Sequence, residues 1–231
     1  MNDLTERLYT LLKSEGAAIA QAGSLLEVAP EERRGMPVGV SIACAFEPHV
    51  IRGIQDGPTL EYFAHYQKLN DMLDSLAEQG AEFLKSEGYS AIAMTRAETA
   101  AVSAALTTPL PHKTVATRAG VGFIGKCALL ITRQYGSAIR LISILTNAPV
   151  DLSEPINKSY CGKCMDCASV CPGSAPTGQN WALGKERSSF FNAGACQKAA
   201  SAQAAAIGVN YTLCGKCIAA CMYTRKYLKY S

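Results

Sequence analysis

The residues best suited to carry chemistry are cysteines near the C-terminal end of the chain. The first group runs from Cys161 to Cys171 with the spacing C-x₂-C-x₂-C-x₃-C and is followed directly by Pro172. This spacing is typical of [4Fe–4S] ligands in two-cluster proteins, where the fourth cysteine binds the other cluster. Two-residue gaps let one tight loop present three thiolates to one cube, and the longer step starts a short helix that carries the fourth sulfur away. The sequence therefore predicts a pair of [4Fe–4S] clusters.

Two such cubes need eight thiolates, and this part of the chain supplies eight cysteines. The spacing assigns the first three cysteines of the first group, together with the last cysteine of the chain, to one cluster. The remaining cysteines go to the other cluster. The first set is Cys161, Cys164, Cys167 and Cys221, and the second set is Cys171, Cys196, Cys214 and Cys217.

Zinc and disulfides are the competing interpretations of these cysteines. A structural zinc site is usually a closed set of four ligands in C-x₂-C pairs, and a third cysteine two residues further on is surplus to it. Disulfides form in oxidising compartments. The N-terminus has no basic stretch followed by an apolar core, and the chain has no run of eighteen apolar residues. We therefore expect a cytoplasmic protein without a secretory signal or a membrane span, and we expect Cys44, inside an apolar run, to serve packing.

The net charge of +3 is unevenly distributed along the chain. Residues 1–150 hold 13 Lys and Arg against 15 Asp and Glu, whereas residues 151–231 hold 9 against 4. A basic segment can indicate nucleic-acid binding. Each oxidised cube with four thiolates carries a charge of about −2, so two cubes would nearly cancel the excess. We interpret the basic balance as compensation for the clusters.

Helices are predicted where apolar residues recur three or four positions apart. The predicted helices are residues 3–15, 58–87, 97–106 and 196–207, and a further helix covers the tail from Tyr223 to Tyr230. The tail mixes basic and aromatic residues, a pattern that can also stack nucleic-acid bases. A docked helix is the preferred interpretation because its tyrosines share one helical face.

Apolar runs of strand length predict buried strands over residues 37–46 and 90–94. Residues 24–36, which precede the first of these strands, predict a solvated turn. Two further runs, 127–132 and 138–145, predict a hairpin. Strand, long helix and strand in this order indicate a crossover unit in an α/β layer. We therefore expect a mixed fold, α/β or α+β, with a cofactor-binding-type domain over 1–150 and a cluster domain over 151–231 that contains a loop at 172–195.

A glycine-rich segment from Arg118 to Lys126 satisfies G-x-G-x-x-G. A dinucleotide-binding fingerprint needs a strand before the glycines and a helix after them. Here the expected order is reversed, which excludes that interpretation. Two alternatives stay open: a loop that contacts a cofactor closely, or a helix stop with solvated charges. His112 follows Pro109-Leu-Pro111 at the start of a predicted helix, and it is either a ligand or acid, or an ordinary histidine.

The segment Pro111–Lys126, the predicted hairpin after it and the cysteine pattern together resemble the epoxyqueuosine reductase family. More distantly they resemble the reductive dehalogenases. The resemblance implies a base-off cobalamin on an α/β domain related to flavin nitroreductases, and two [4Fe–4S] clusters in a ferredoxin-like domain that pass electrons to it. It also implies residues that lie against the corrinoid or its nucleotide tail. These residues are Arg118, Gly120, Gly122, Gly125 and Lys126.

Two departures from the family shape the expected function. The family carries an acidic proton donor ahead of the glycines, whereas Thr107–His112 has no carboxylate, so His112 is the nearest catalytic candidate. The family's C-terminal helical-repeat domain, associated with tRNA, is missing, so we expect a different substrate and no tRNA partner. The leading hypothesis is an oxidoreductase whose clusters feed a corrinoid. The alternatives are a non-catalytic electron carrier for a partner protein, and a flavin at the same site.

Overall fold

The computed structural model describes residues 1–99 and 106–230, and these residues form two compact units that alternate along the chain. The sequence predicts one division near residue 150, whereas each observed unit combines separate stretches. Unit 1 is Met1–Ala45, Leu69–Gly122 and Arg140–Ile156, and unit 2 is Phe46–Lys68, Phe123–Ile139 and Asn157–Ser231.

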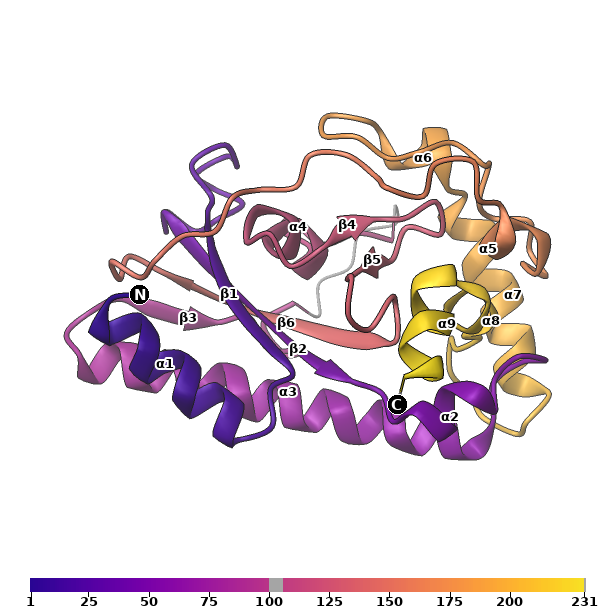
Figure 1. Ribbon diagram of the computed structural model, residues 1–231, viewed down its shortest axis with the longest axis horizontal. Helices are drawn as coiled ribbons and strands as arrows, with labels where there is room; N and C mark the ends of the chain where they lie inside the picture. The colour runs from indigo at the N-terminus through magenta and orange to yellow at the C-terminus, as the bar shows by residue number, and fades with distance from the viewer. Residues whose placement is uncertain (100–105, 231) are drawn as a thin grey trace. The chain divides into compact units, whose positions relative to one another are not determined.

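Helices and strands are mixed along the chain (Figure 1), which confirms the expected combination of α and β structure. Among the described residues, no helix is both long enough and apolar enough to cross a membrane. The first half contains α1 (Asp3–Ser14), β1 (Ile19–Ser24), β2 (Val38–Ala45), α2 (Pro48–Arg52), α3 (Leu60–Ser86), β3 (Ala91–Ala93) and α4 (His112–Arg118). The second half contains β4 (Phe123–Ile124), β5 (Leu130–Ile131), β6 (Ile139–Thr146), α5 (Asp166–Ser169), α6 (Arg187–Phe190), α7 (Ala193–Ala205), α8 (Lys216–Ala220) and α9 (Met222–Lys229).

Unit 1 is built on a sheet that, within the described residues, has four strands in the order β1-β2-β6-β3. The β1–β2 and β3–β6 ladders are antiparallel. Every residue of β2 except Ala45 is buried, as its continuous apolar run predicts. Because β6 lies between β2 and β3, the two strands that α3 connects are not neighbours. The strand–helix–strand order therefore does not make a simple pair of adjacent strands.

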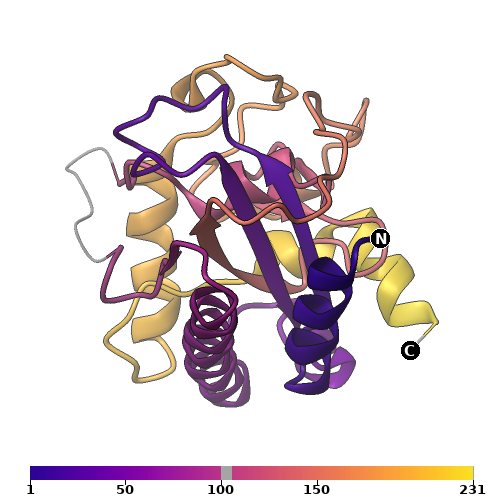
Figure 2. The ribbon, with the colours of Figure 1, turned by 90° about the vertical axis from the view of Figure 1, so that its left-hand side faces the viewer.

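Helices cover both faces of this sheet (Figure 2). A Cβ at Gly80 of α3 would lie 2.6 Å from Ile144 of the strand β6 and 3.2 Å from Leu12 of α1, so α3 and α1 pack together on one face of the sheet. On the other face α4 packs closely because Gly23 and Gly39 stand opposite each other in the β1–β2 register. A Cβ at Gly23 would collide with the backbone carbonyl of Arg118. The absence of side chains at this pair fixes where the end of α4 lies.

Unit 2 is held together by aromatic side chains from distant parts of the chain. Phe46 is fully buried and its ring lies 5.2 Å from that of Tyr62. Tyr227 of α9 donates a hydrogen bond to the Phe46 carbonyl at 2.9 Å and packs edge-on against Tyr135. Tyr223 also packs within the unit, whereas Tyr230 is 82% exposed. The prediction of a docked C-terminal helix is confirmed for the first two of its three tyrosines.

The predicted hairpin of 127–132 and 138–145 is wrong. β5 pairs with β4, from Phe123↔Ile131 to Ile124↔Leu130, and β6 joins the four-stranded sheet instead. The connection does turn tightly, with a bridge between Thr132 and Gly136, but β6 is eight residues long and mostly buried. An apolar strand of that kind is most stable in the middle of a sheet, where both faces are covered.

Other expectations divide between confirmed and missed elements. The structure confirms three predicted helices, two predicted strands and one predicted turn, with shifts of a few residues at their ends. These are the helices 3–15, 58–87 and 196–207, the strands 37–46 and 90–94, and the turn at 24–36. The loop expected at 172–195 contains the short α6. β1 was not predicted, because its sequence is mostly small residues and Ile19 is the one β-branched residue in it. The helix predicted at 97–106 lies largely outside the described residues.

The close packing of α4 predicts that Gly39→Ala destabilises unit 1. The added Cβ would lie 2.6 Å from Val115 Cγ1 and 2.9 Å from Leu25 Cδ1, so the core must shift. We expect a loss of about 1–3 kcal/mol in the free energy of unfolding. Gly194→Ala is the control, because its Cβ would meet nothing closer than Asn192 Oδ1 at 3.7 Å. Urea unfolding followed by circular dichroism measures both; an equal effect of the two substitutions would contradict this account.

Candidate metal centre

The predicted cluster cysteines lie in unit 2, at the ends of short helices and in the loops before them. Cys161 and Cys164 lie in the turn before α5, and Cys164 N–H donates to the Cys161 carbonyl at 3.0 Å. Cys167 lies inside α5, where it is buried. Cys221 follows α8 and precedes α9. These residues form the first predicted set.

Electrostatic coupling shows that the structure brings the remote Cys221 to the first group. Burial raises the pKa of the Cys221 thiol, and the charge of Cys161 raises it further. Burial also raises the pKa of Tyr223, with further contributions from Cys161, Cys221 and Cys164. The tyrosine therefore lies among three of the four predicted ligands.

The second predicted set is brought together in the same way. Burial raises the pKa of Cys196 in α7, and the charges of Cys171 and Cys214 add to it. The pKa of Cys214 is raised by burial and by Cys171. Cys217 lies in α8, three residues after Cys214. The thiols of three separate segments are thus neighbours in this part of unit 2.

Several of these sulfurs already accept hydrogen bonds from the backbone. Ala175 N–H donates to Cys171 Sγ at 3.3 Å. Backbone bonds to Lys216 and to residues 223 and 224 lower the pKa of Cys214 and Cys221, although the pKa of both is raised overall. N–H groups aimed at sulfur stabilise thiolates and are one of the means by which proteins tune iron–sulfur clusters.

Within residues 1–99 and 106–230, no three His, Cys, Asp or Glu side chains converge closely enough to hold one metal ion. Thiolates on a single zinc lie close together, since bonds of about 2.3 Å in a tetrahedron place the sulfurs about 3.8 Å apart. A cube attaches each thiolate to a different iron, which spreads the sulfurs further.

An aromatic and cationic layer adjoins the first cysteine loop. The ring of Phe123 packs edge-on against Tyr160 at 5.3 Å and Tyr223 at 5.5 Å. Lys126 is 3% exposed, and its Nζ donates to the Cys164 carbonyl at 2.9 Å and contacts Met165 Sδ at 3.6 Å. Its charge also lowers the pKa of Cys167, against larger effects that raise it. Lys126 is thus a buried cation fixed to the cysteine loop.

The remaining residues of the glycine-rich segment are used inside the protein. Arg118 is buried in unit 1, where its Nη1 donates to Glu27 at 2.7 Å and its Nη2 to the Ile156 carbonyl at 3.1 Å. Gly120 has φ +67°, and a Cβ there would lie 2.6 Å from the Glu154 carbonyl oxygen. Gly122 ends the stretch of chain that belongs to unit 1. Gly125 lies in unit 2, where its N–H donates to Leu129.

His112 begins α4, as the preceding prolines predict, and its Nδ1 lies 3.1 Å from Ser143 Oγ of β6. Burial lowers the pKa of His112 to about 4, and the charge of Arg140 contributes. The imidazole is therefore neutral at pH 7, so it holds no readily donated proton.

Cys44 packs in β2 as expected, and burial raises its pKa to about 12.

Sequence reasoning missed Cys127, which is buried between β4 and β5. Cys167 lowers the pKa of its thiol, but Cys217 and burial outweigh this effect and raise the pKa overall. A signal in the sequence marks this residue, because the triplet Gly-Lys-Cys occurs at 125–127 as well as at 162–164 and 215–217. The two later triplets end in predicted ligands.

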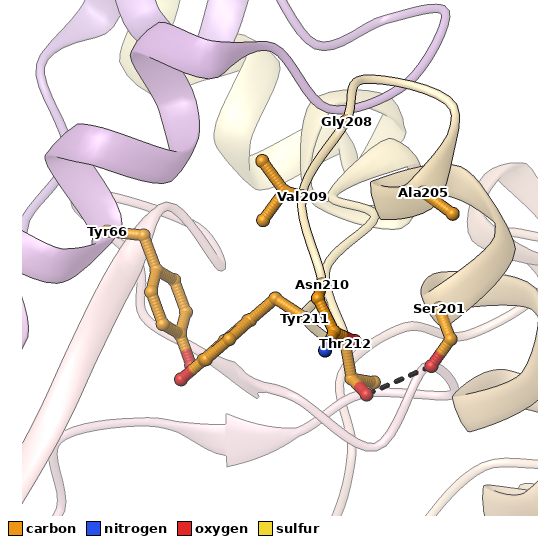
Figure 3. A pocket seen from close by; sticks show the side chains of 8 residues that line it. All are labelled: Tyr66, Ser201, Ala205, Gly208, Val209, Asn210, Tyr211 and Thr212. Carbon is orange, nitrogen blue, oxygen red and sulfur yellow. Dashed lines mark hydrogen bonds between the residues drawn. The ribbon is translucent and has the colours of Figure 1, made fainter.

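A pocket of about 850 Å³ in unit 2 contains none of the predicted site residues. In Figure 3 Tyr66 and Tyr211 lie at one side, with their rings 5.7 Å apart, and Ser201 Oγ lies 3.1 Å from Thr212 Oγ1 at the other. Apart from the two phenols it offers no titratable group. It is therefore not the centre of the chemistry that the cysteines predict. Its lining is completed by Ala205, Gly208, Val209 and Asn210.

The chain matches no protein-family model. It is similar to epoxyqueuosine reductase of Gloeobacter violaceus, with 45% identity over 69 residues, which is 30% of this chain and 21% of the relative. The chain thus matches about a fifth of the length of that curated relative. The matching segment supports a relation to epoxyqueuosine reductases.

Solved structures share the fold over almost the whole chain. An epoxyqueuosine reductase with a tRNA stem loop has a TM-score of 0.64 and 21% identity, covering 96% of this chain and 65% of that chain. A reductive dehalogenase, described with a mechanism for B12-dependent dehalogenation, has a TM-score of 0.72 and 16% identity, covering 97% of this chain and 33% of that chain. At such identities the likeness shows the fold.

The pKa of His112 predicts a pH-dependent stability. The pKa falls from 6.5 to about 4 on folding, so between these values the unfolded chain binds the proton and the folded chain does not. The free energy of unfolding is therefore highest above pH 6.5. It falls by at most about 1.4 kcal/mol per pH unit as the pH is lowered toward 4. The free energy of unfolding of His112→Gln should not show this dependence on pH. The exposed His49 provides the control His49→Gln, which should keep it; equal slopes in wild type and His112→Gln would contradict the assignment.

Proposed function

We propose that this chain is an iron–sulfur redox protein that carries two [4Fe–4S] clusters in unit 2. The observation that supports this most directly is the grouping of thiols: Cys221 with Cys161, and Cys196 with Cys171 and Cys214. The two groups agree with the ligand sets that the spacing predicts. Bound clusters would supply one-electron carriers of low potential. The partial similarity to proteins named as reductases supports a redox role.

The electrostatics of unit 2 fit these clusters. The raised pKa values of Cys196, Cys214 and Cys221 mean that these thiols are protonated at pH 7 before iron binds. Iron binds thiolates, so assembly would release these protons and replace the repulsion between sulfurs by bonds to cations. The buried ammonium of Lys126 would offset part of the negative charge of the first cluster.

Anaerobic purification with iron and sulfide assays tests this assignment. The wild-type protein should contain about eight irons, and Cys164→Ala should retain about half, because one of two cubes loses a ligand. Cys44→Ala removes a buried thiol outside both sets and should retain about eight. Full iron retention in Cys164→Ala would refute the ligand assignment. Stoichiometric zinc in the wild-type protein would refute the clusters themselves.

We further propose that the electrons pass to a cofactor bound by unit 1, with a corrinoid as the first candidate and a flavin as the second. The fold shared with a reductive dehalogenase described as B12-dependent supports this part. Two of the residues that the family resemblance assigns to the corrinoid, Arg118 and Lys126, also bind within the protein. Arg118 donates to Glu27 and Ile156, and Lys126 donates to the first cysteine loop.

A non-catalytic electron carrier for a partner protein is the second candidate function. The same inward use of Arg118 and Lys126 favours it, as does the neutral state of His112, which lacks a proton to give at pH 7. Such a carrier needs the clusters and a docking surface, but no substrate site.

Titration of the iron-loaded protein with cobalamin and with FMN separates the two functions. A base-off cobalamin spectrum at stoichiometric ratio would support a corrinoid as the cofactor. Binding of FMN instead would make a flavin the cofactor. Eight irons without either cofactor would leave the electron carrier. A band-shift assay with a tRNA stem loop completes the test, since one structural relative was solved with that ligand. Tight binding there would overturn our expectation that this chain has no tRNA partner.

A further inference from the structure

Two large side chains of the first cysteine loop are exposed to solvent. Tyr160 is 47% exposed and Met165 is 45% exposed, and in the sequence they flank the predicted ligands Cys161 and Cys164. Neither of these cysteines is fully buried. Tyrosine and methionine are enriched where one protein binds another, because both offer a large contact area that adapts to a partner. The loop thus presents apolar surface beside ligands of the first predicted cluster.

The turn between β4 and β5 holds both exposed side chains in place. The ring of Phe123 packs edge-on against that of Tyr160 at 5.3 Å. Lys126 Nζ contacts Met165 Sδ at 3.6 Å and donates to the carbonyl of the cysteine before it at 2.9 Å. Side chains that are already positioned lose little conformational entropy when a partner binds. The apolar surface is therefore prepared for contact.

Cations surround this apolar surface. Lys163 is exposed in the loop itself. Lys226 is exposed on α9, with its Nζ 5.9 Å from the ring centre of Tyr223, and that ring packs edge-on against the same phenylalanine. The carboxylate of Asp166 accepts a hydrogen bond from Arg225 Nη2 at 2.6 Å, which neutralises its charge. An apolar centre with a cationic rim results.

The charge of unit 2 as a whole has the same sign as this rim. Counted by the observed units, unit 2 holds 13 Lys and Arg against 5 Asp and Glu, whereas unit 1 holds 9 against 14. Two oxidised cubes with their thiolates carry about −4 together, so they would offset only about half of the excess in unit 2. The remainder attracts acidic surfaces before contact is made.

We infer that Tyr160, Lys163, Met165, Arg225 and Lys226 form a docking surface for a small electron-carrier protein whose redox group is surrounded by Asp and Glu side chains. The inference rests on the two-cluster function proposed above and names the kind of partner that would supply the electrons. The partner loses one electron and one cube gains it, and no bond forms or breaks.

A nucleic acid is the other macromolecule that a basic surface attracts. Surfaces that bind nucleic acid are more polar and more positively charged than those between proteins, because phosphates require cations across the contact. Here two large side chains occupy the centre and the cations lie around them. This arrangement matches a protein interface, in which charges at the rim guide the encounter and apolar groups make the central contact.

Calorimetric titration of the iron-loaded protein with an acidic flavodoxin in its oxidised form tests the docking. Lys163→Glu and Lys226→Glu should each weaken binding about tenfold, because each places a negative charge opposite the acidic partner. The control Lys68→Glu makes the same change in net charge on an exposed residue of α3 and should weaken binding less than about twofold. Iron content and circular dichroism should be unchanged in all three variants.

Stopped-flow mixing with the reduced flavodoxin gives a second readout. The second-order rate constant for cluster reduction should fall about tenfold in Lys163→Glu and Lys226→Glu and stay close to the wild-type value in Lys68→Glu. Raising the salt concentration from about 0.05 M to about 0.5 M should slow the wild type and bring the variants closer to it. Should Lys163→Glu lose iron, Lys226→Glu still tests the surface, because it lies outside the cysteine loop.

The failures of the two proposals are distinguishable. Wild-type protein without clusters would overturn the proposed function, and the docking with it. Eight irons in a protein that neither binds flavodoxin nor accepts its electron would overturn the docking alone. An equal loss of binding in all three variants would reveal a response to net charge and overturn the assigned surface. So would a single-stranded RNA that Lys226→Glu no longer binds while flavodoxin binding is unchanged.

Discussion

Buried thiols that lie side by side cannot all become thiolates unless cations lie among them. This constraint dominates unit 2, where the pKa of Cys196, Cys214 and Cys221 is raised and each thiol lies near others of its set. Proteins seldom gather so many cysteines for packing alone, because one small apolar side chain would serve as well. The short helices α5 and α8, the backbone N–H groups aimed at sulfur and the layer of aromatic rings all serve one arrangement. They hold the sulfurs in place, and iron would remove the electrostatic cost.

The two charged ends of the glycine-rich segment bind within different units of the protein. Its first residue, Arg118, ties the end of α4 to Glu27 and Ile156 within unit 1. Its last, Lys126, is the cation bound to the first cysteine loop in unit 2. The glycines between them permit close approach to neighbouring atoms: a Cβ would lie 2.6 Å from the Glu154 carbonyl oxygen at Gly120 and 2.4 Å from Ile131 Cδ1 at Gly125. The segment is therefore a structural connector that also brings charge to the cysteines.

How much the sequence predicts depends on the range of the interaction that decides each feature. The cysteine spacing is local, so the prediction of two ligand sets needs nothing beyond the sequence of those segments. The long α3 and the buried β2 are specified by their own apolar patterns. The partner of β6 and the existence of β1 depend on which strands meet in the sheet, and no pattern within either segment specifies that. Cys127 was missed for the same reason: the cysteines that act on its pKa, Cys167 and Cys217, lie far from it along the chain.

The alternation of the two units has a consequence for how this protein can be divided. The eight predicted ligands all lie between residues 161 and 221, so the corresponding stretch of the gene resembles a segment that could be transferred on its own. The packing around them does not follow that boundary, because Phe46, Tyr62 and the turn that carries Cys127 come from earlier in the chain. A single genetic exchange could move the ligands to another protein but would leave behind the side chains that shield them. Recombination is thus expected to preserve unit 2 only when it inherits both halves of the chain together.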